Sequence, residues 1–234
     1  MSKSSAAGAT LHRAAVLTAT ASLLLAGLAF ADPGGTRTYR VTIENLTANN
    51  GGGAAQVLSP ALVLAHTNRV HLFEVGMPAN QAVVDVAEDA IGATGLAMFG
   101  SDPEVASVMV APGAPIAPGA SASFEITTRR NATKLSLVSM LVNTNDGFTG
   151  LDAIQLSSNF QEFYAEAYDA GSEVNDQLAG SIPGPCCGDT GRNGTDEHGV
   201  ITHHPGIQSG VGDLDPAQWG WSGAVARITV ERVK

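Results

Sequence analysis

The chain has 234 residues, of which 12 are Lys or Arg and 22 are Asp or Glu, so its formal net charge at pH 7 is −10. Because it is acidic and has no basic cluster beyond Arg129-Arg130, we do not expect it to bind nucleic acid or anionic lipid. Its length suffices for one sizeable hydrophobic core, so we expect a single globular domain.

The N-terminus has the pattern of a secretory signal peptide. Basic residues precede an apolar run over residues 14–28, and Ala29-Phe30-Ala31 then offers a small-x-small cleavage site before Asp32. The run is shorter than the roughly 20 residues that span a bilayer, although an uncleaved anchor is the alternative. The sequence therefore predicts a signal peptide over residues 1–31 and a secreted or periplasmic domain over 32–234, with no transmembrane segment after cleavage.

Short segments of alternating apolar and polar residues predict an all-β fold. In the segment Thr38–Leu46, Tyr39, Val41 and Ile43 alternate with polar residues, as in a half-buried strand. Asn80 is a candidate N-cap for one short helix that ends before Gly92. Many short strands separated by Pro/Gly turns predict a sandwich or barrel. Further strands are expected at residues 58–64, 70–76, 105–111, 121–128, 134–142, 153–156, 160–168 and 224–233.

A long polar segment, residues 179–221, precedes the last expected strand. A loop of this length in a compact domain is normally functional or disordered. It contains His198, His203 and His204, which are either ligands of a transition metal or solvated loop residues. Adjacent histidines in a strand point to opposite faces, so at most one of the last two would join His198.

The same segment holds both cysteines, Cys186 and Cys187, which are adjacent. Three states are open for them: a vicinal disulfide, free thiols or a soft metal site. The segment 183–204 is therefore the place for an alternative function, either transition-metal or redox handling or a metal-dependent hydrolase. Such a hydrolase would use Asp196, Glu197 and His198 as acid–base groups. No nucleophile elbow, His-Glu-x-x-His pair or phosphate-binding glycine motif is present, so we do not expect an enzyme.

Two short acidic loops suggest a cation site. Asp146 lies in the first loop, and Asp169 and Glu173 lie in the second, each loop next to a segment that alternates like a strand. Carboxylates at one end of a sheet offer only oxygen ligands, which suits Ca²⁺, and the glycines at 147 and 171 allow tight turns. The alternative is that Asp and Gly merely form solvated turns.

Seven segments stand as landmarks along the chain: Tyr39–Leu46, Ser59–Leu62, Leu72–Gly76, Ser136–Val142, Asn145–Asp152, Tyr168–Glu173 and Val225–Val230. In the order and spacing of these landmarks the chain resembles a spondin N-terminal domain, in the form of a stand-alone bacterial protein. The resemblance implies an antiparallel β-sandwich similar to C2 domains, with a calcium ion held by acidic loops at one end.

Carried over by position, the calcium ligands fall on Asp146, Asp169 and Glu173. Asp146 stands in the loop that corresponds to the family's Ser-Pro-Asp-Trp, and the other two stand in its Asp-Ala-Gly-Thr-Asp. This chain departs in three places: Thr144-Asn145 replaces Ser-Pro, Gly147 replaces Trp, and Glu173 replaces Asp. The function implied is a secreted, non-catalytic, calcium-binding module whose partner is an envelope or extracellular protein or a glycan.

Overall fold

The computed structural model describes residues 35–47, 55–184, 186–188 and 194–234. All of them belong to one compact unit, Asp32–Lys234. The expected signal peptide, residues 1–31, lies outside the described residues. None of the described helices is long and apolar enough to cross a membrane.

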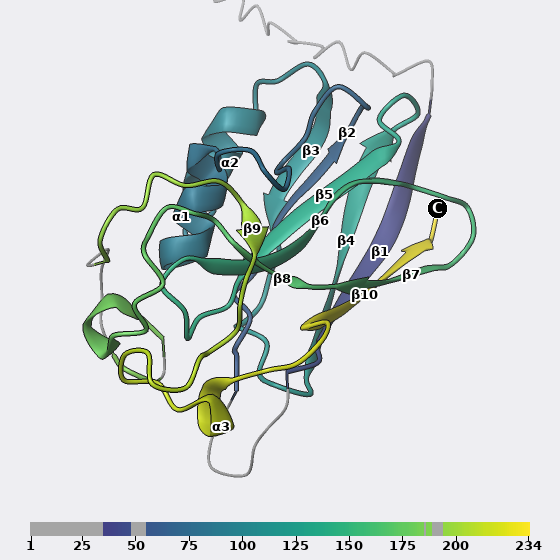
Figure 1. Cartoon of the computed structure of the whole chain (residues 1–234). Helices are drawn as coiled ribbons and strands as arrows, with labels where there is room; N and C mark the ends of the chain where they lie inside the picture. Colours follow the sequence, from purple (N-terminus) through teal and green to yellow (C-terminus); the bar gives the residue numbers. More distant parts are fainter. Residues whose placement is uncertain (1–34, 48–54, 185, 189–193) are drawn as a thin grey trace, which may run out of the picture. The chain divides into compact units, whose positions relative to one another are not determined.

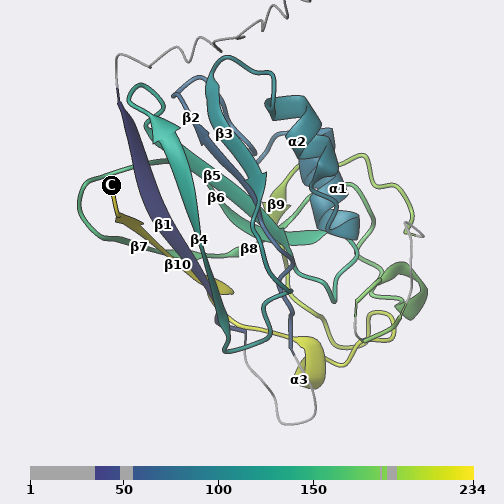
Figure 2. The ribbon, with the colours of Figure 1, turned by 180° about the vertical axis from the view of Figure 1, so that it is seen from behind.

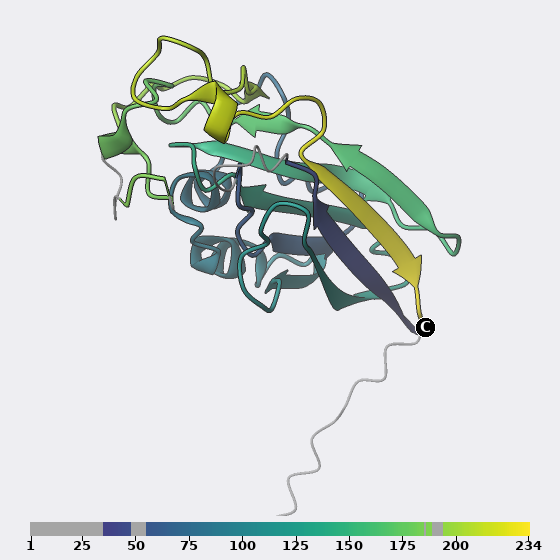
Figure 3. The same cartoon turned by 90° about the horizontal axis from the view of Figure 1, so that it is seen from below.

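Two antiparallel sheets form the fold, which confirms the predicted β-sandwich (Figures 1 and 3). Each neighbouring pair of strands is antiparallel. The four-stranded sheet has the order β4 (Ser121–Arg129), β1 (Thr36–Asn45), β10 (Ala226–Arg232), β7 (Gln161–Ala165). The six-stranded sheet has the order β3 (Val105–Val110), β2 (Leu62–His66), β5 (Lys134–Met140), β6 (Gly147–Gln155), β8 (Ala167–Asp169), β9 (Thr202–His203).

The period-2 pattern of β1 places its apolar side chains between the sheets. Tyr39, Val41 and Ile43 are buried, whereas the alternate residues are partly or fully exposed. In the register of the four-stranded sheet, Val41 lies opposite Val230 of β10 and Phe124 of β4, so all three strands bury the same face. One side of this sheet therefore faces the core and the other faces solvent.

The six-stranded sheet is covered on both faces. Val63 and Ala65 of β2 belong to the core between the sheets, whereas the intervening Leu62 and Leu64 pack in a second apolar cluster. This second cluster includes side chains of α1 (Gln81–Asp89) and Phe99 of α2 (Ala93–Phe99), which lie on the outer face of the sheet (Figure 2). Burial on both faces explains why β2 has no exposed position.

The helix predicted from Asn80 is present as α1. The Asn80 side chain accepts hydrogen bonds from the backbone N–H groups of Ala82 (3.0 Å) and Val83 (3.1 Å), which is an N-cap. The helix ends at Asp89 because Ala90 has a left-handed backbone (φ 58°), so it stops before Gly92.

The prediction of only one short helix was wrong. The structure also contains α2 and α3 (Pro216–Trp219). The α2 helix is too short to show a period, and it includes Gly95, where a Cβ would lie 2.3 Å from Leu62 Cδ2. Its helix-weakening glycine is therefore a packing residue. Asp215 caps α3, with Pro216 in the first turn, and this signal is readable in the sequence.

The largest differences from the predicted strands are at four places. Residues 70–76 form an irregular segment with a bend and a turn rather than a strand, β2 begins at Leu62 instead of 58, and β6 begins at Gly147 instead of 153. The segment expected as one strand over 160–168 is two, and they pair with different sheets. In the long polar segment, the described residues contribute β9, α3 and the short 3₁₀ helix η1 (Ala179–Ser181).

Candidate metal centre

Asp146 is held inside the turn that joins β5 to β6, and its side chain is fully buried. Thr144 shapes this turn. Its hydroxyl donates to the Leu141 carbonyl (2.6 Å) and accepts from the Gly147 N–H (2.9 Å). A Cβ at residue 147 would lie 2.4 Å from Thr144 Oγ1. The turn that presents Asp146 therefore depends on a glycine immediately after it.

The two oxygens of the Asp146 carboxylate have different surroundings. Oδ2 accepts hydrogen bonds from the backbone N–H groups of Ser172 (2.9 Å) and Glu173 (3.0 Å) and from the Ser172 hydroxyl (3.2 Å). Oδ1 is buried and has no hydrogen-bond partner. Burial, followed by the nearby charge of Asp169, raises the pKa of Asp146 to about 7. A buried acceptor without a partner is costly, so Oδ1 marks a place for a cation or a donor.

Asp169 lies beside Asp146 because β8 pairs with the start of β6, where Asp169 is opposite Gly147. One carboxylate oxygen accepts from the Gly171 N–H (2.6 Å), and the other accepts from the Asn175 side chain. Gly171 has a left-handed backbone (φ 67°), and a Cβ there would lie 2.7 Å from the backbone N and O of Val200. This second loop is therefore also shaped by a glycine.

Glu173 is buried, and the groups that act on its carboxylate include Glu88 and Gly194 as well as Asp146. Its carboxylate interacts with the backbone N–H of Gly194 and with the charge of Glu88 on α1. Burial is the largest cause, and the charges of Glu88 and Asp146 add to it, so that the pKa of Glu173 rises to about 7. A Cβ at Gly194 would lie 2.2 Å from Glu173 Oε2, so this carboxylate packs directly on that backbone.

A pocket of about 500 Å³ adjoins Glu173. Asp196 and His198, two of the acid–base candidates of the alternative function, also line this pocket, together with Glu88. The third, Glu197, donates its backbone N–H to the Ser172 carbonyl (2.9 Å). The pocket is therefore acidic on several sides.

The structure thus brings Asp146, Asp169 and Glu173 into one region. Asp146 is electrostatically coupled to each of the other two. However, the described residues contain no group of three or more His, Cys, Asp or Glu side chains in an arrangement that could hold a metal ion. Calcium binding by this triplet stays a prediction.

The histidines of the long segment do not gather at one site. His203 pairs with Glu166 (Nδ1 to Oε2, 2.9 Å) on the surface, whereas His204 is half-buried and its Nε2 atom is buried. His204 Nδ1 accepts from the Gly206 N–H (2.9 Å), and its Nε2 has no partner. Burial lowers the pKa of His204 to about 4, although the charge of Asp169 opposes this shift.

Cys186 and Cys187 form a disulfide bond with each other, which selects one of the three states left open by the sequence. They pack on a small apolar cluster of Ile182, Ile207 and Leu214. With both sulfurs in this bond, no free thiol is available for a soft metal.

Several residues around the candidate site were missed by sequence reasoning. Ser172 supplies two of the hydrogen bonds to Asp146, Asn175 supplies one to Asp169, and Glu88 influences Glu173 from the helix. Ser172 lies inside the acidic loop and could have been proposed from its position. Glu88 is brought there only by the packing of α1 on the sheet, for which the sequence has no local signal.

Comparison with known protein families places part of the chain in a described family. The model of the family described as Spondin_N matches residues 54–174, just over half of the chain. The matched range contains Asp146, Asp169 and Glu173, whereas the landmark segments at 39–46 and 225–230 lie outside it. No curated protein matches the chain.

Proposed function

Since the chain belongs to the spondin N-terminal domain family, we propose that it is a non-catalytic extracellular binding module that binds Ca²⁺ through Asp146, Asp169 and Glu173. Domains of this family are typical of extracellular proteins. The proposal includes export by the segment 1–31 and a partner that is an extracellular or envelope protein or a glycan. The acidic net charge of −10 disfavours anionic partners such as nucleic acid.

The observation that carries the calcium proposal is the unpartnered Oδ1 of Asp146. Its other oxygen already accepts three hydrogen bonds, so the carboxylate is fixed while one oxygen lacks a partner. A hard divalent cation is a suitable partner for a carboxylate oxygen. A bound cation would also offset the repulsion between Asp146 and Asp169.

The raised pKa values support the same view. Asp146 and Glu173 are buried close to other carboxylates, and the pKa of each is raised to about 7. Neighbouring acids that resist ionisation are stabilised in the ionised form by a cation, whose charge reverses the local electrostatics. When bound, Ca²⁺ would supply positive charge, and by accepting oxygen ligands from both loops it would hold the loops together, with no chemical step.

Of the three side chains, Glu173 has the weakest support. Its carboxylate interacts with the Gly194 N–H, and its coupling to Glu88 is larger than its coupling to Asp146. Asp146 and Asp169 are therefore the principal ligands in the proposal. Glu173 contributes as a third ligand or as a further negative charge.

Thermal unfolding tests the proposal. The melting temperature of the protein is compared in EDTA and in millimolar Ca²⁺, with Mg²⁺ as a second ion. A ligand present at about 100 times its Kd stabilises the folded state by about 2.7 kcal/mol, which in a domain of this size raises Tm by several degrees. We expect this rise for the wild-type protein and a much smaller one for Asp146→Asn and Asp169→Asn.

Glu166→Gln is the matched control, because Glu166 is an acidic residue next to β8 that pairs with His203 on the surface. It should retain the full calcium response. Equal melting temperatures in EDTA and Ca²⁺ for the wild-type protein would refute calcium binding.

A further inference from the structure

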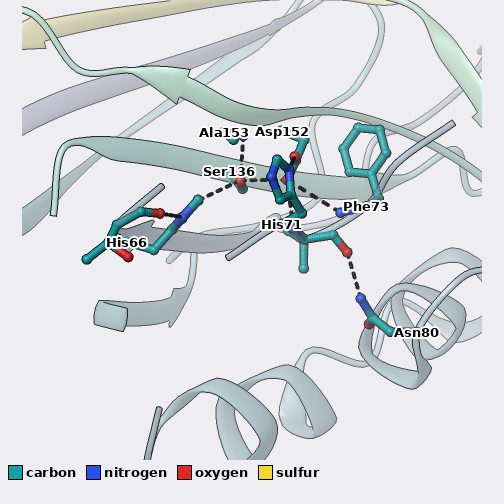
Figure 4. Close-up of polar contacts among 9 residues, drawn as sticks. His66, His71, Phe73, Asn80, Ser136, Asp152 and Ala153 are labelled. Carbon is teal, nitrogen blue, oxygen red and sulfur yellow. Dashed lines mark hydrogen bonds and ion pairs between the residues drawn. The ribbon is translucent and has the colours of Figure 1, made fainter. Parts of the chain in front are cut away.

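A second polar cluster, which includes none of the three proposed calcium ligands, lies on the six-stranded sheet (Figure 4). It consists of His66 at the end of β2, Ser136 on β5, Asp152 on β6, and His71 in the turn before α1. Spaced by up to 86 positions in the sequence, these residues form one continuous chain of hydrogen bonds. His71 Nδ1 contacts Asp152 Oδ2 (2.5 Å), Ser136 Oγ contacts Asp152 Oδ1 (2.9 Å), and His66 Nε2 contacts Ser136 Oγ (2.7 Å).

A break in the regular pairing of β5 and β6 directs the Asp152 side chain into this chain of hydrogen bonds. The register shifts between Leu135 and Leu137, so that Ser136 faces a bulge on β6. Ala153, inside the bulge, has a left-handed backbone (φ 47°), and its N–H donates to Ser136 Oγ (2.8 Å). A bulge commonly redirects a side chain, and a non-glycine residue in this conformation carries a strain cost.

The chain of hydrogen bonds runs from the protein surface at His71 to the interior at His66. The side chain of His71 is 46% exposed and that of Asp152 is 14% exposed, whereas Ser136 and His66 are fully buried. A proton from solvent can therefore reach the buried imidazole of His66 through three intervening groups. This layout differs from a nucleophilic triad, in which the histidine contacts an accessible serine. The serine here is inaccessible.

The number of protons in the chain can be counted. The Thr67 carbonyl only accepts, so its contact with His66 Nδ1 (2.7 Å) fixes a proton on that nitrogen. A neutral His66 then has an unprotonated Nε2. Ser136 has one hydroxyl proton, which cannot be donated both to His66 Nε2 and to Asp152 Oδ1. With neutral His66, one of these two short contacts lacks a proton.

With one additional proton, every contact in this chain of hydrogen bonds has a donor. If His66 Nε2 is protonated, it donates to Ser136 Oγ, and Ser136 donates to Asp152. Ser136 then uses its single donor and both lone pairs, because the second lone pair accepts from Ala153. The positive imidazolium is balanced by the Asp152 carboxylate at the other side of the serine. The same count holds if the added proton lies on Asp152 Oδ1 and Ser136 donates to His66.

We propose that His66, Ser136, Asp152 and His71 form a proton-binding relay, in which one proton taken up from mildly acidic solution is shared between the buried His66 and Asp152. The relay is independent of the calcium proposal. Because the groups are coupled, the midpoint of uptake belongs to the whole set rather than to one residue.

The groups around His66 favour proton uptake at a mildly acidic pH rather than at neutral pH. Burial, the largest cause, lowers the pKa of His66 below its ordinary value, and the Thr67 carbonyl and Asp152 oppose this. His71 and Lys134 add to the lowering. Glu104 also belongs to this environment, because it accepts from the Thr67 hydroxyl (2.6 Å).

The shared proton would act on the turn before α1. Asp152 Oδ1 accepts the backbone N–H groups of Leu72 (2.6 Å) and Phe73 (3.4 Å), and thereby fastens this turn to the sheet. The Leu72 carbonyl in turn accepts from the side chain of Asn80, the N-cap of α1 (2.6 Å). Proton uptake therefore alters the groups that position the start of the helix.

Nitrogen NMR of the labelled protein tests the relay. Between pH 8 and pH 5 in EDTA, we expect His66 to carry its proton on Nδ1 at high pH and to gain a second one on Nε2. The signals of the Asp152 carboxylate and of His71 should change over the same pH range, because both groups belong to the same hydrogen-bonded chain. Observation of His66 with its proton on Nε2 at high pH, or of no titration down to acid unfolding, would overturn the proposal.

Ser136→Ala removes the link. It should reduce the proton affinity of His66 at least threefold, a shift of about half a pH unit. Ser139→Ala is the matched control, because Ser139 is a buried serine of the same strand whose hydroxyl donates to the Ser59 carbonyl (2.7 Å). An unchanged His66 midpoint in Ser136→Ala would refute the relay. If that variant does not fold, Asp152→Asn should lower the same affinity, and an unchanged midpoint there would equally refute it.

Discussion

The Thr144 hydroxyl occupies the space that a side chain at Gly147 would need. Its oxygen accepts the Gly147 N–H at 2.9 Å and would lie 2.4 Å from a Cβ at that position. The two residues are therefore interdependent. This explains physically why a large side chain at position 147 is incompatible with Thr144 in the present turn.

Gly147→Ala should lower the free energy of unfolding by about 1–3 kcal/mol, the usual cost of inserting a methyl group into a packed interior. Urea unfolding measures this. In Thr144→Ala/Gly147→Ala the loss should be less than the sum of the two single losses, because the clash with Oγ1 is gone. Gly180→Ala is the control, since a Cβ there meets no atom within 4 Å, and it should change stability little. Additive losses in the double variant would contradict the interdependence.

The contribution of Asp146 and Glu173 to the stability of the calcium-free protein should increase as the pH falls from about 8 to about 5, whereas the lowered pKa values of the His66 and His204 imidazoles act in the opposite direction. Burial and neighbouring charges raise the pKa of Asp146 and Glu173 to about 7 in the folded state. A carboxyl group whose pKa is raised on folding stabilises the protein fully below its unfolded pKa of about 4. That contribution is lost as the pH rises through about 7.

Melting temperatures in EDTA across this pH range measure the effect, which we expect to be on the order of a few kcal/mol. Asp146→Asn should remove much of the slope, whereas the surface variant Glu166→Gln should keep it. Millimolar Ca²⁺ should weaken the slope as well, because the ion competes with protons for the same oxygens. The same pH dependence in Asp146→Asn as in the wild-type protein would contradict the prediction, because the histidines contribute equally to both.

Local sequence patterns predicted those elements of the fold that bury only one face. The alternation in β1 predicted its buried positions, and Asn80 predicted the start of α1. The start of β6 was missed because residues 147–150 are all buried and so do not alternate. The α2 helix was missed because it contains Gly95. Glycine disfavours helix formation, and it is needed here because the backbone packs closely against Leu62.

The residues of the candidate sites were also predictable only in part from the sequence. Asp146 and Asp169 were identified from two acidic loops, and the pairing of β6 with β8 does place them together. The carboxylate of Glu173 also interacts with Glu88 and Gly194, which are distant from it in sequence. The relay from His71 to His66 depends on the bulge at Ala153, and no local spacing indicates it.

Asn45→Ala should destabilise the protein by about 2–3 kcal/mol, although Asn45-Leu46-Thr47 reads as a glycosylation triplet. Asn45 is fully buried, and its amide donates to the carbonyls of Gln56 (2.8 Å) and Ile116 (2.8 Å). Its own oxygen accepts from Thr47 (backbone 3.0 Å, hydroxyl 2.7 Å). Alanine removes all four hydrogen bonds. Urea unfolding checks the loss, with Asn159→Ala on the surface as the control; equal stability of the two variants would contradict the prediction.

Gly171→Ala should combine backbone strain with a collision and thereby weaken the second acidic loop. Gly171 has a φ of 67°, and a Cβ there would lie 2.7 Å from the backbone N and O of Val200. Gly210 is the matched control, because its φ of 79° is also left-handed but a Cβ there meets no atom within 4 Å. Gly210→Ala should therefore cost only about 1–2 kcal/mol of strain, and Gly171→Ala should cost clearly more.

The calcium response gives this comparison a second readout. The Gly171 N–H donates to Asp169 (2.6 Å), and the Gly171 carbonyl accepts the Gly199 N–H (2.7 Å), so movement at residue 171 displaces a proposed ligand. The Tm rise produced by millimolar Ca²⁺ should therefore shrink in Gly171→Ala and persist in Gly210→Ala. Similar losses of stability in the two variants would show that strain alone, and not the approach of Val200, requires a glycine at position 171.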